Sequence, residues 1–94
     1  MTIAEVLQLA RRMTGHTLRT ARGARFAVRV EGNAPWFTPA STGTPRCDGA
    51  AALARFVARY NETGSLRPGD YQDITRNSSY YAALLRAGGY GGRA

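Results

Sequence analysis

The spacing of apolar residues predicts a helix at the start of the chain. Between residues 3 and 14 apolar side chains recur every three or four positions, which places them on one face of an amphipathic helix. Thr2 and Glu5 have the identities and the spacing of a capping box, in which each side chain accepts a hydrogen bond from the other residue's backbone. Gly15 follows as a stop signal, so the first helix is expected over 3–14.

Next, apolar and polar residues alternate with a period of two, which predicts a small antiparallel sheet. Apolar and polar residues alternate through 25–31, as in a strand with one buried face. The glycine and asparagine that follow predict a two-residue hairpin turn. The returning strand has two prolines, which cannot donate to a ladder of hydrogen bonds, so we expect it to be short or to lie at the sheet edge. A third, short edge strand is expected within 16–22.

The helical period returns in the second half of the chain. A loop over 39–47 precedes Asp48, the expected cap of a helix over 49–61. Gly64 is suited to the left-handed position that ends such a helix. A shorter helix is expected over 68–74, because a helix tolerates proline in its first turn.

The last expected helix covers 77–87 and has a polar start. Two glycines stop it, and residues 91–94 are expected to form a loose tail. The elements together predict an α+β fold in one domain: an N-terminal helix, a two- to three-stranded antiparallel sheet and three C-terminal helices in a tri-helical arrangement. The helix and hairpin occupy 1–47 of this domain, and the tri-helical segment occupies 48–90.

Composition narrows the class of protein. The chain has 94 residues, of which 44% are hydrophobic, enough for one domain with a modest core. No apolar run approaches the roughly 20 residues of a membrane span, and no secretory signal is visible, so the expected location is the cytoplasm. Cys47 is the single cysteine, which leaves neither an internal disulfide nor a cysteine cluster for zinc. No cofactor is expected.

The charge of the chain is strongly positive. Thirteen arginines, with no lysine, stand against six acidic residues and give a net charge of +7. A GC-rich genome is one explanation for arginine in place of lysine, but it leaves the excess of positive charge unexplained. Because each arginine set against a phosphate releases condensed counterions, nucleic acid is the favoured partner. An anionic membrane and an acidic protein are lesser alternatives.

The order of elements after residue 47 resembles a known DNA-binding unit. A helix, a glycine-containing turn, a short helix, a polar turn and another helix are similar to the tri-helical core of helix-turn-helix and winged-helix domains. This resemblance implies that the third helix enters the major groove of DNA and that its first side chains touch base edges. The turn between the two short helices lacks glycine, and the chain after Tyr90 is too short for a wing. The residues that carry the resemblance are Leu53, Phe56, Val57 and Tyr60, then Tyr71 and Ile74, then Tyr81, Leu84 and Leu85.

Five consecutive residues at the start of the last helix are candidate contacts to nucleic acid. On the resemblance they open the recognition helix, where asparagine suits adenine, arginine suits guanine, and serine suits phosphate. The alternative is that Asn77 or Ser78 merely caps the helix. A helix cap explains only one of the five polar residues, so the whole run is kept as a candidate site. The five residues are Arg76, Asn77, Ser78, Ser79 and Tyr80.

Further arginines are candidate phosphate contacts. Arg25 and Arg29 lie on the outer face of the expected strand, in a possible basic stripe with Arg19 and Arg22. Arg46 ends a loop rich in small and hydroxyl residues, which could face DNA. The alternatives are a solvated strand face and a purely structural loop.

Catalysis has little support in the sequence. His16 is the only histidine, and Cys47 has no histidine near it along the chain. Asp70 and Asp73, with Glu62, could hold a metal, but acidic residues in the first turn of a short helix are the simpler interpretation. We therefore expect no enzyme activity, no catalytic residues and no metal ligands.

These patterns predict a small, basic, non-catalytic DNA-binding protein, with double-stranded DNA as the expected target and no membrane partner. Transcription regulation and prokaryotic defence are the expected settings. One alternative is a protein-interaction module, an adaptor or inhibitor that binds an acidic protein surface. Another is a single-strand or RNA binder that uses Trp36, Phe37 and the exposed sheet face.

Overall fold

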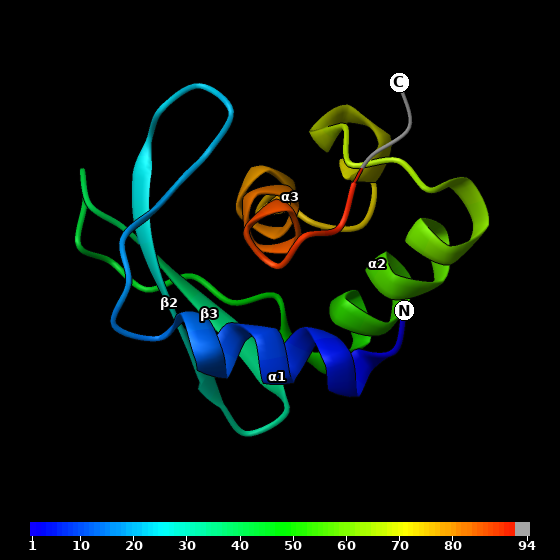
Figure 1. Cartoon of the computed structure of the whole chain (residues 1–94), viewed down its shortest axis with the longest axis horizontal. Coiled ribbons are helices and arrows are strands. Elements are labelled where there is room, and N and C mark those ends of the chain that lie inside the picture. The colour runs from blue at the N-terminus through cyan, green and yellow to red at the C-terminus, as the bar shows by residue number, and fades with distance from the viewer. Residues whose placement is uncertain (92–94) are drawn as a thin grey trace.

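The chain folds as a helix, a three-stranded antiparallel sheet and two further α-helices, in a computed structural model that describes residues 1–91. In Figure 1 the hairpin end of the sheet and α2 lie on opposite sides of α3, and β3 also contacts α2 directly. The expected α+β class is confirmed; of the expected tail over 91–94, residues 92–94 lie outside the described part. The elements are α1 (Ile3–Met13), β1 (Leu18–Arg19), β2 (Arg25–Glu31), β3 (Ala34–Pro39), α2 (Gly49–Thr63), a 3₁₀ turn η1 (Pro68–Tyr71) and α3 (Ser78–Ala87).

The expected set of three helices after the sheet is wrong. Within residues 1–91 only two α-helices follow the sheet, because the middle one is the single turn η1. A side chain from α2 binds the backbone at this turn. Arg59 Nη1 donates to the backbone oxygen of Asp70 at 2.9 Å, and that oxygen is the one that an α-helix would offer to Ile74. The backbone nitrogens of Ile74 and Thr75 both donate to the backbone oxygen of Tyr71, at 2.9 and 3.0 Å, and the first of these bonds has the shorter 3₁₀ spacing.

The first helix forms where the apolar spacing and the capping box predict it. The backbone nitrogen of Glu5 donates to Thr2 Oγ1, and the backbone nitrogen of Thr2 donates to Glu5 Oε1, both at 3.1 Å. Each bond satisfies a backbone group that the helix itself leaves unpaired. Farther along the chain, Gly64 ends α2 in the left-handed conformation, with φ of 68°.

The sheet has the order β1-β2-β3, and its register separates two faces. On the inner face Leu18 lies opposite Phe26, and Val28 lies opposite Phe37. Residues alternate between faces along a strand, so their neighbours form the outer face. The opposed outer pairs are Arg19 with Arg25, Ala27 with Thr38 and Arg29 with Trp36.

The core lies between the inner face of the sheet and the helices. Helix α3 is its central element, since six of its ten residues are buried. Phe56 of α2 stacks on Tyr71 of η1 and on Tyr81 of α3, with ring centroids 4.1 and 4.7 Å apart. Phe37 meets Tyr81 edge-on at 4.9 Å, which joins the strands to the helices. None of the helices within 1–91 has both the length and the apolar composition needed to cross a membrane.

The outer edge of β3 is occupied by the following loop. Phe37 and Arg46 exchange two backbone hydrogen bonds, at 2.9 and 2.7 Å. The backbone N–H and C=O groups of Phe37 therefore point away from β2. The backbone groups of Pro35 and Pro39, two positions before and two positions after Phe37, point the same way. Proline has no N–H, so these two positions have no donor to leave unpaired.

Candidate nucleic-acid interface

The polar start of α3 is divided between the interior and the surface. Asn77 and Ser78 are buried, with only 3% and 5% of their surface exposed. Arg76 and Ser79 are exposed, and Tyr80 is half-buried. The ring of Tyr80 packs against aromatic rings of the sheet, at 4.9 and 5.7 Å between centroids. Only part of the predicted run is therefore accessible to a partner.

The buried side chain of Asn77 belongs to a hydrogen-bond cluster that is partly shielded from water. Its Nδ2 donates to Asp48 Oδ2 at 2.6 Å, and the hydroxyl of Thr75 donates to the same oxygen. The backbone nitrogen of Asn77 donates to Thr75 Oγ1 at 2.9 Å. Neither Asp48 nor Asn77 makes the side-chain cap that the sequence predicts for its helix. Asp48 instead joins the starts of α2 and α3, which gives Asn77 a structural role.

The hydroxyl of Tyr81 lies next to this cluster. It is buried and has no hydrogen-bond partner among the described residues, and neither does the side-chain oxygen of Asn77. Burial raises the pKa of Tyr81 far above its usual value, and the nearby negative charge of Asp48 raises that pKa further. The ring stays neutral at any physiological pH, so Tyr81 contributes packing rather than charge.

The accessible residues at the start of α3 line two adjoining hollows on its surface. The larger, of about 540 Å³, lies between the β1–β2 hairpin and η1, and Arg22, Ser79 and Arg86 line it. The smaller, of about 360 Å³, adds Arg76. No acidic residue is among those that line either one. We call the two together the basic hollow, defined by Arg22, Gln72, Arg76, Ser79 and Arg86.

Two residues of the basic hollow, Gln72 and Arg86, were not among the sequence candidates. Arg86 lies seven positions after Ser79, which is two turns along the same face of α3. That spacing is the signal that could have found it. Its guanidinium makes one long hydrogen bond, 3.4 Å to the backbone oxygen of Leu66.

The arginines of the outer sheet face differ in how their charges are balanced. Arg29 Nε lies 3.1 Å from Glu31 Oε1, and its guanidinium lies over the ring of Trp36, 5.3 Å from the centroid. Arg19 and Arg25 are directly opposed and exposed, and neither has a salt bridge within residues 1–91. Like charges directly opposed in a sheet repel each other. Arg19 and Arg25 are therefore free to bind an anion, whereas the charge of Arg29 is partly neutralised.

The predicted contact Arg46 lies beside Tyr80 of α3. Its side chain is exposed, and its guanidinium lies 5.8 Å from the centroid of the Tyr80 ring. Phe37, which the single-strand alternative requires as a stacking residue, is fully buried. Trp36 is half-buried beside Arg29 and remains the accessible aromatic residue of the outer face.

The segment of the chain that contains the hairpin has no acidic residue. Residues 6–30 contain six arginines and no aspartate or glutamate. Four of the six acidic residues fall within 48–73, in the half of the chain that forms α2 and η1. There Asp73 binds Arg59 through two bonds of 2.5 and 2.9 Å, and this pairing holds the pKa of Asp73 below its usual value. The only charged residues of the hairpin segment are thus arginines.

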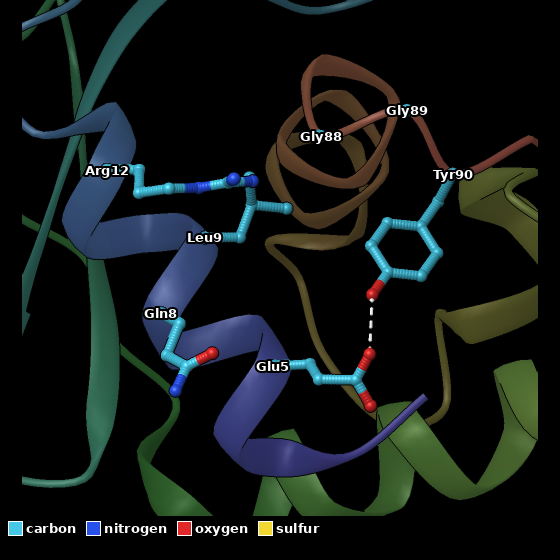
Figure 2. A pocket seen from close by; sticks show the side chains of 7 residues that line it. All are labelled: Glu5, Gln8, Leu9, Arg12, Gly88, Gly89 and Tyr90. Atoms are coloured by element: carbon cyan, nitrogen blue, oxygen red, sulfur yellow. Dashed lines mark hydrogen bonds between the residues drawn. The ribbon is translucent and has the colours of Figure 1, made fainter.

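A further groove lies between α1 and the chain that follows α3. It has a volume of about 280 Å³ and includes Glu5, Leu9, Arg12 and Gly88 in its lining. In Figure 2 the hydroxyl of Tyr90 points at the Glu5 carboxylate, to which it donates at 3.0 Å. This bond lowers the pKa of Glu5, so the carboxylate is charged at neutral pH. A charged carboxylate in the lining makes this groove unsuited to a polyanion.

Comparisons with protein-family models, with curated proteins and with solved structures gave no match. Function therefore has to be argued from the site itself. Across residues 1–91 no three or more histidine, cysteine, aspartate or glutamate side chains are grouped in a way that could hold a metal ion.

Proposed function

We propose that this chain is a small non-catalytic protein that binds double-stranded DNA through the basic surface around the β1–β2 hairpin and α3. The basic hollow carries the proposal. It brings Arg22, Arg76 and Arg86 together with the hydroxyl of Ser79, and no carboxylate lines it. Guanidinium groups and a hydroxyl are the donors that phosphate oxygens accept.

Neutralisation of phosphates supplies the binding free energy in this proposal. Each arginine that replaces condensed counterions adds affinity that weakens as salt rises. The exposed pair Arg19 and Arg25 extends the same chemistry along the hairpin. The net charge of +7 draws the protein toward any duplex before specific contacts form.

The burial of α3 favours phosphate contacts over base contacts for this helix. Most of its surface faces the core, and Ser79 and Arg86 are exposed on its solvent side. The hairpin and η1 line the same hollow and so flank the helix. A helix that is flanked in this way contacts the DNA backbone more readily than it enters a groove. A role in transcription regulation or in prokaryotic defence stays a prediction.

Fluorescence anisotropy with a labelled 20-base-pair duplex tests the proposal. We expect Arg76→Ala and Arg86→Ala each to weaken binding and to reduce the slope of log affinity against log salt by about one. Arg55→Ala is the matched control: it removes the same charge from an exposed position on α2, across the molecule from the hairpin (Figure 1). Equal losses in all three variants would show a non-local charge effect. No binding to duplex at low salt would overturn the proposal and favour an acidic protein surface as the partner.

A further inference from the structure

The tip of the β1–β2 hairpin is fixed by its own hydrogen bonds. The backbone nitrogen of Thr20 donates to the oxygen of Ala24 at 2.9 Å, and that of Gly23 donates to the oxygen of Thr20 at 2.8 Å. The side chain of Thr20 also accepts from the nitrogen of Ala24, at 3.1 Å. Gly23 has φ of 87°, a conformation that glycine adopts without strain. The tip therefore has one defined shape before any partner binds.

This fixed tip holds three exposed arginines close together. Arg19 and Arg25 are opposed at the base of the turn, and Arg22 lies within it. Neither of the two acidic residues nearest in sequence, Glu5 and Glu31, is free for this group. Glu5 accepts bonds from Thr2 and Tyr90, while Glu31 pairs with Arg29. A rigid turn that gathers like charges without a counter-charge fits an anionic partner.

The shape of the hairpin indicates how it contacts that partner. Its loop extends past the end of the sheet, beside α3, at the upper left of Figure 1. All residues from 19 to 25 are exposed except Thr20, which is half-buried. A two-stranded ribbon is narrow enough to enter the major groove of duplex DNA, which is about 12 Å wide.

We propose that the β1–β2 hairpin, and not α3, is the element that enters the major groove. Arg22 at the tip donates to N7 and O6 of a guanine, which a guanidinium can contact with two hydrogen bonds. Arg19 and Arg25 contact phosphates at the groove walls. Arg76, Ser79 and Arg86 of the basic hollow bind the backbone that runs past α3, so that in this scheme Arg22 contacts a base rather than a phosphate. This inference rests on the proposed function, since it names the part of the basic surface that contacts the bases.

The test replaces guanine by 7-deazaguanine in a labelled duplex, which removes the N7 acceptor from the major groove and leaves the phosphates unchanged. We expect the replacement to weaken binding of the unaltered protein by about fivefold or more. Arg22→Ala should weaken binding to the ordinary duplex and abolish the difference between the two duplexes. Arg86→Ala, a phosphate contact in this scheme, should weaken binding to both while preserving their difference.

Competition experiments separate the two grooves. Methyl green, which occupies the major groove, should displace the protein, and netropsin, which occupies the minor groove, should not. Displacement by netropsin alone would overturn the inference. Equal affinity of the unaltered protein for the ordinary and the 7-deazaguanine duplex would also overturn the inference. After either result, a weaker binding of Arg86→Ala to duplex would still support the proposed function. Failure of every duplex to bind at low salt would instead overturn the proposed function itself. Circular dichroism of Arg22→Ala checks that the variant is folded.

Discussion

Asn77 donates a hydrogen bond of 2.6 Å to Asp48, a residue 29 positions earlier in the chain. Asp48 immediately precedes α2, and Asn77 immediately precedes α3. The carboxylate also accepts a bond from Thr75, so one charged group holds two helix starts together. Hydrogen bonds to a charged group are the stronger kind in proteins, and these are partly shielded from water.

Asn77→Ala should therefore lower stability rather than change DNA recognition. We expect a loss of about 2 kcal/mol in the free energy of unfolding, measured by urea denaturation, because the bond to a charged acceptor is removed. Ser79→Ala is the matched control, since Ser79 is exposed and should change stability by less than about 0.5 kcal/mol. If Asn77→Ala kept full stability and bound duplex more weakly, Asn77 would be a contact residue as the sequence suggested.

Two buried tyrosines provide a second comparison. The hydroxyl of Tyr71 donates to the backbone oxygen of Ser65 at 2.5 Å, whereas that of Tyr81 has no partner in residues 1–91. Tyr71→Phe should cost about 1 kcal/mol of stability, because an acceptor loses its donor. Tyr81→Phe should be neutral or stabilising, because it removes a buried polar group that makes no bond. Thermal denaturation of both variants measures the two changes in stability. A larger loss of stability for Tyr81→Phe would show that a water molecule forms a hydrogen bond with the Tyr81 hydroxyl.

The opposed arginines of the hairpin should lower stability while they support binding. Arg25→Gln removes the repulsion from Arg19, so we expect a gain of about 0.5 kcal/mol that shrinks as salt screens the charges. The same variant should bind duplex more weakly. Arg29→Gln is the control, since Arg29 is paired with Glu31 and its replacement should bring no gain in stability. Melting temperatures at low and high salt measure the change in stability, and fluorescence anisotropy on the same samples measures duplex binding. A gain in stability for both variants would contradict the repulsion between Arg19 and Arg25 and the pairing of Arg29 with Glu31.

The pair formed by Arg59 and Asp73 should make stability depend on pH. The pKa of Asp73 is lowered from 3.8, chiefly by its hydrogen bonds to Arg59. The pair therefore stabilises the fold above pH 3.8, and this contribution disappears as pH falls through the lowered pKa. We expect Arg59→Ala to have a lower melting temperature than the unaltered protein at pH 6, and the gap to narrow toward pH 2, where only the loss of the bond from Arg59 to the backbone oxygen of Asp70 remains. A gap that is constant across this range would assign the effect to packing instead.

The local elements were predictable because their signals lie within a few residues. The capping box of Thr2 and Glu5, the alternation through 25–31 and the left-handed Gly64 all depend on neighbours in sequence. The prediction of a short helix over 68–74 was wrong, and here the contact involved is distant in sequence. The side chain that binds the backbone there belongs to Arg59, 11 positions before Asp70 in the chain.

The same distinction applies to the candidate site. The composition indicated a basic surface, and Arg76 and Ser79 are exposed as a contact site requires. Asn77 could not be separated from them by sequence, because its partner Asp48 is brought near only by packing of the helices. The place of Arg22 beside Arg86 likewise depends on how the hairpin lies along α3.

The two prolines of β3 have a consequence for self-association. An exposed strand edge with free N–H groups is a template on which other chains add strands and aggregate. Pro35 and Pro39 offer no such groups, and Arg46 already occupies the position between them. At the opposite edge β1 is two residues long and lies against α3. The sheet is therefore protected at both sides against growth into intermolecular β-structure, and a partner has to bind it through side chains.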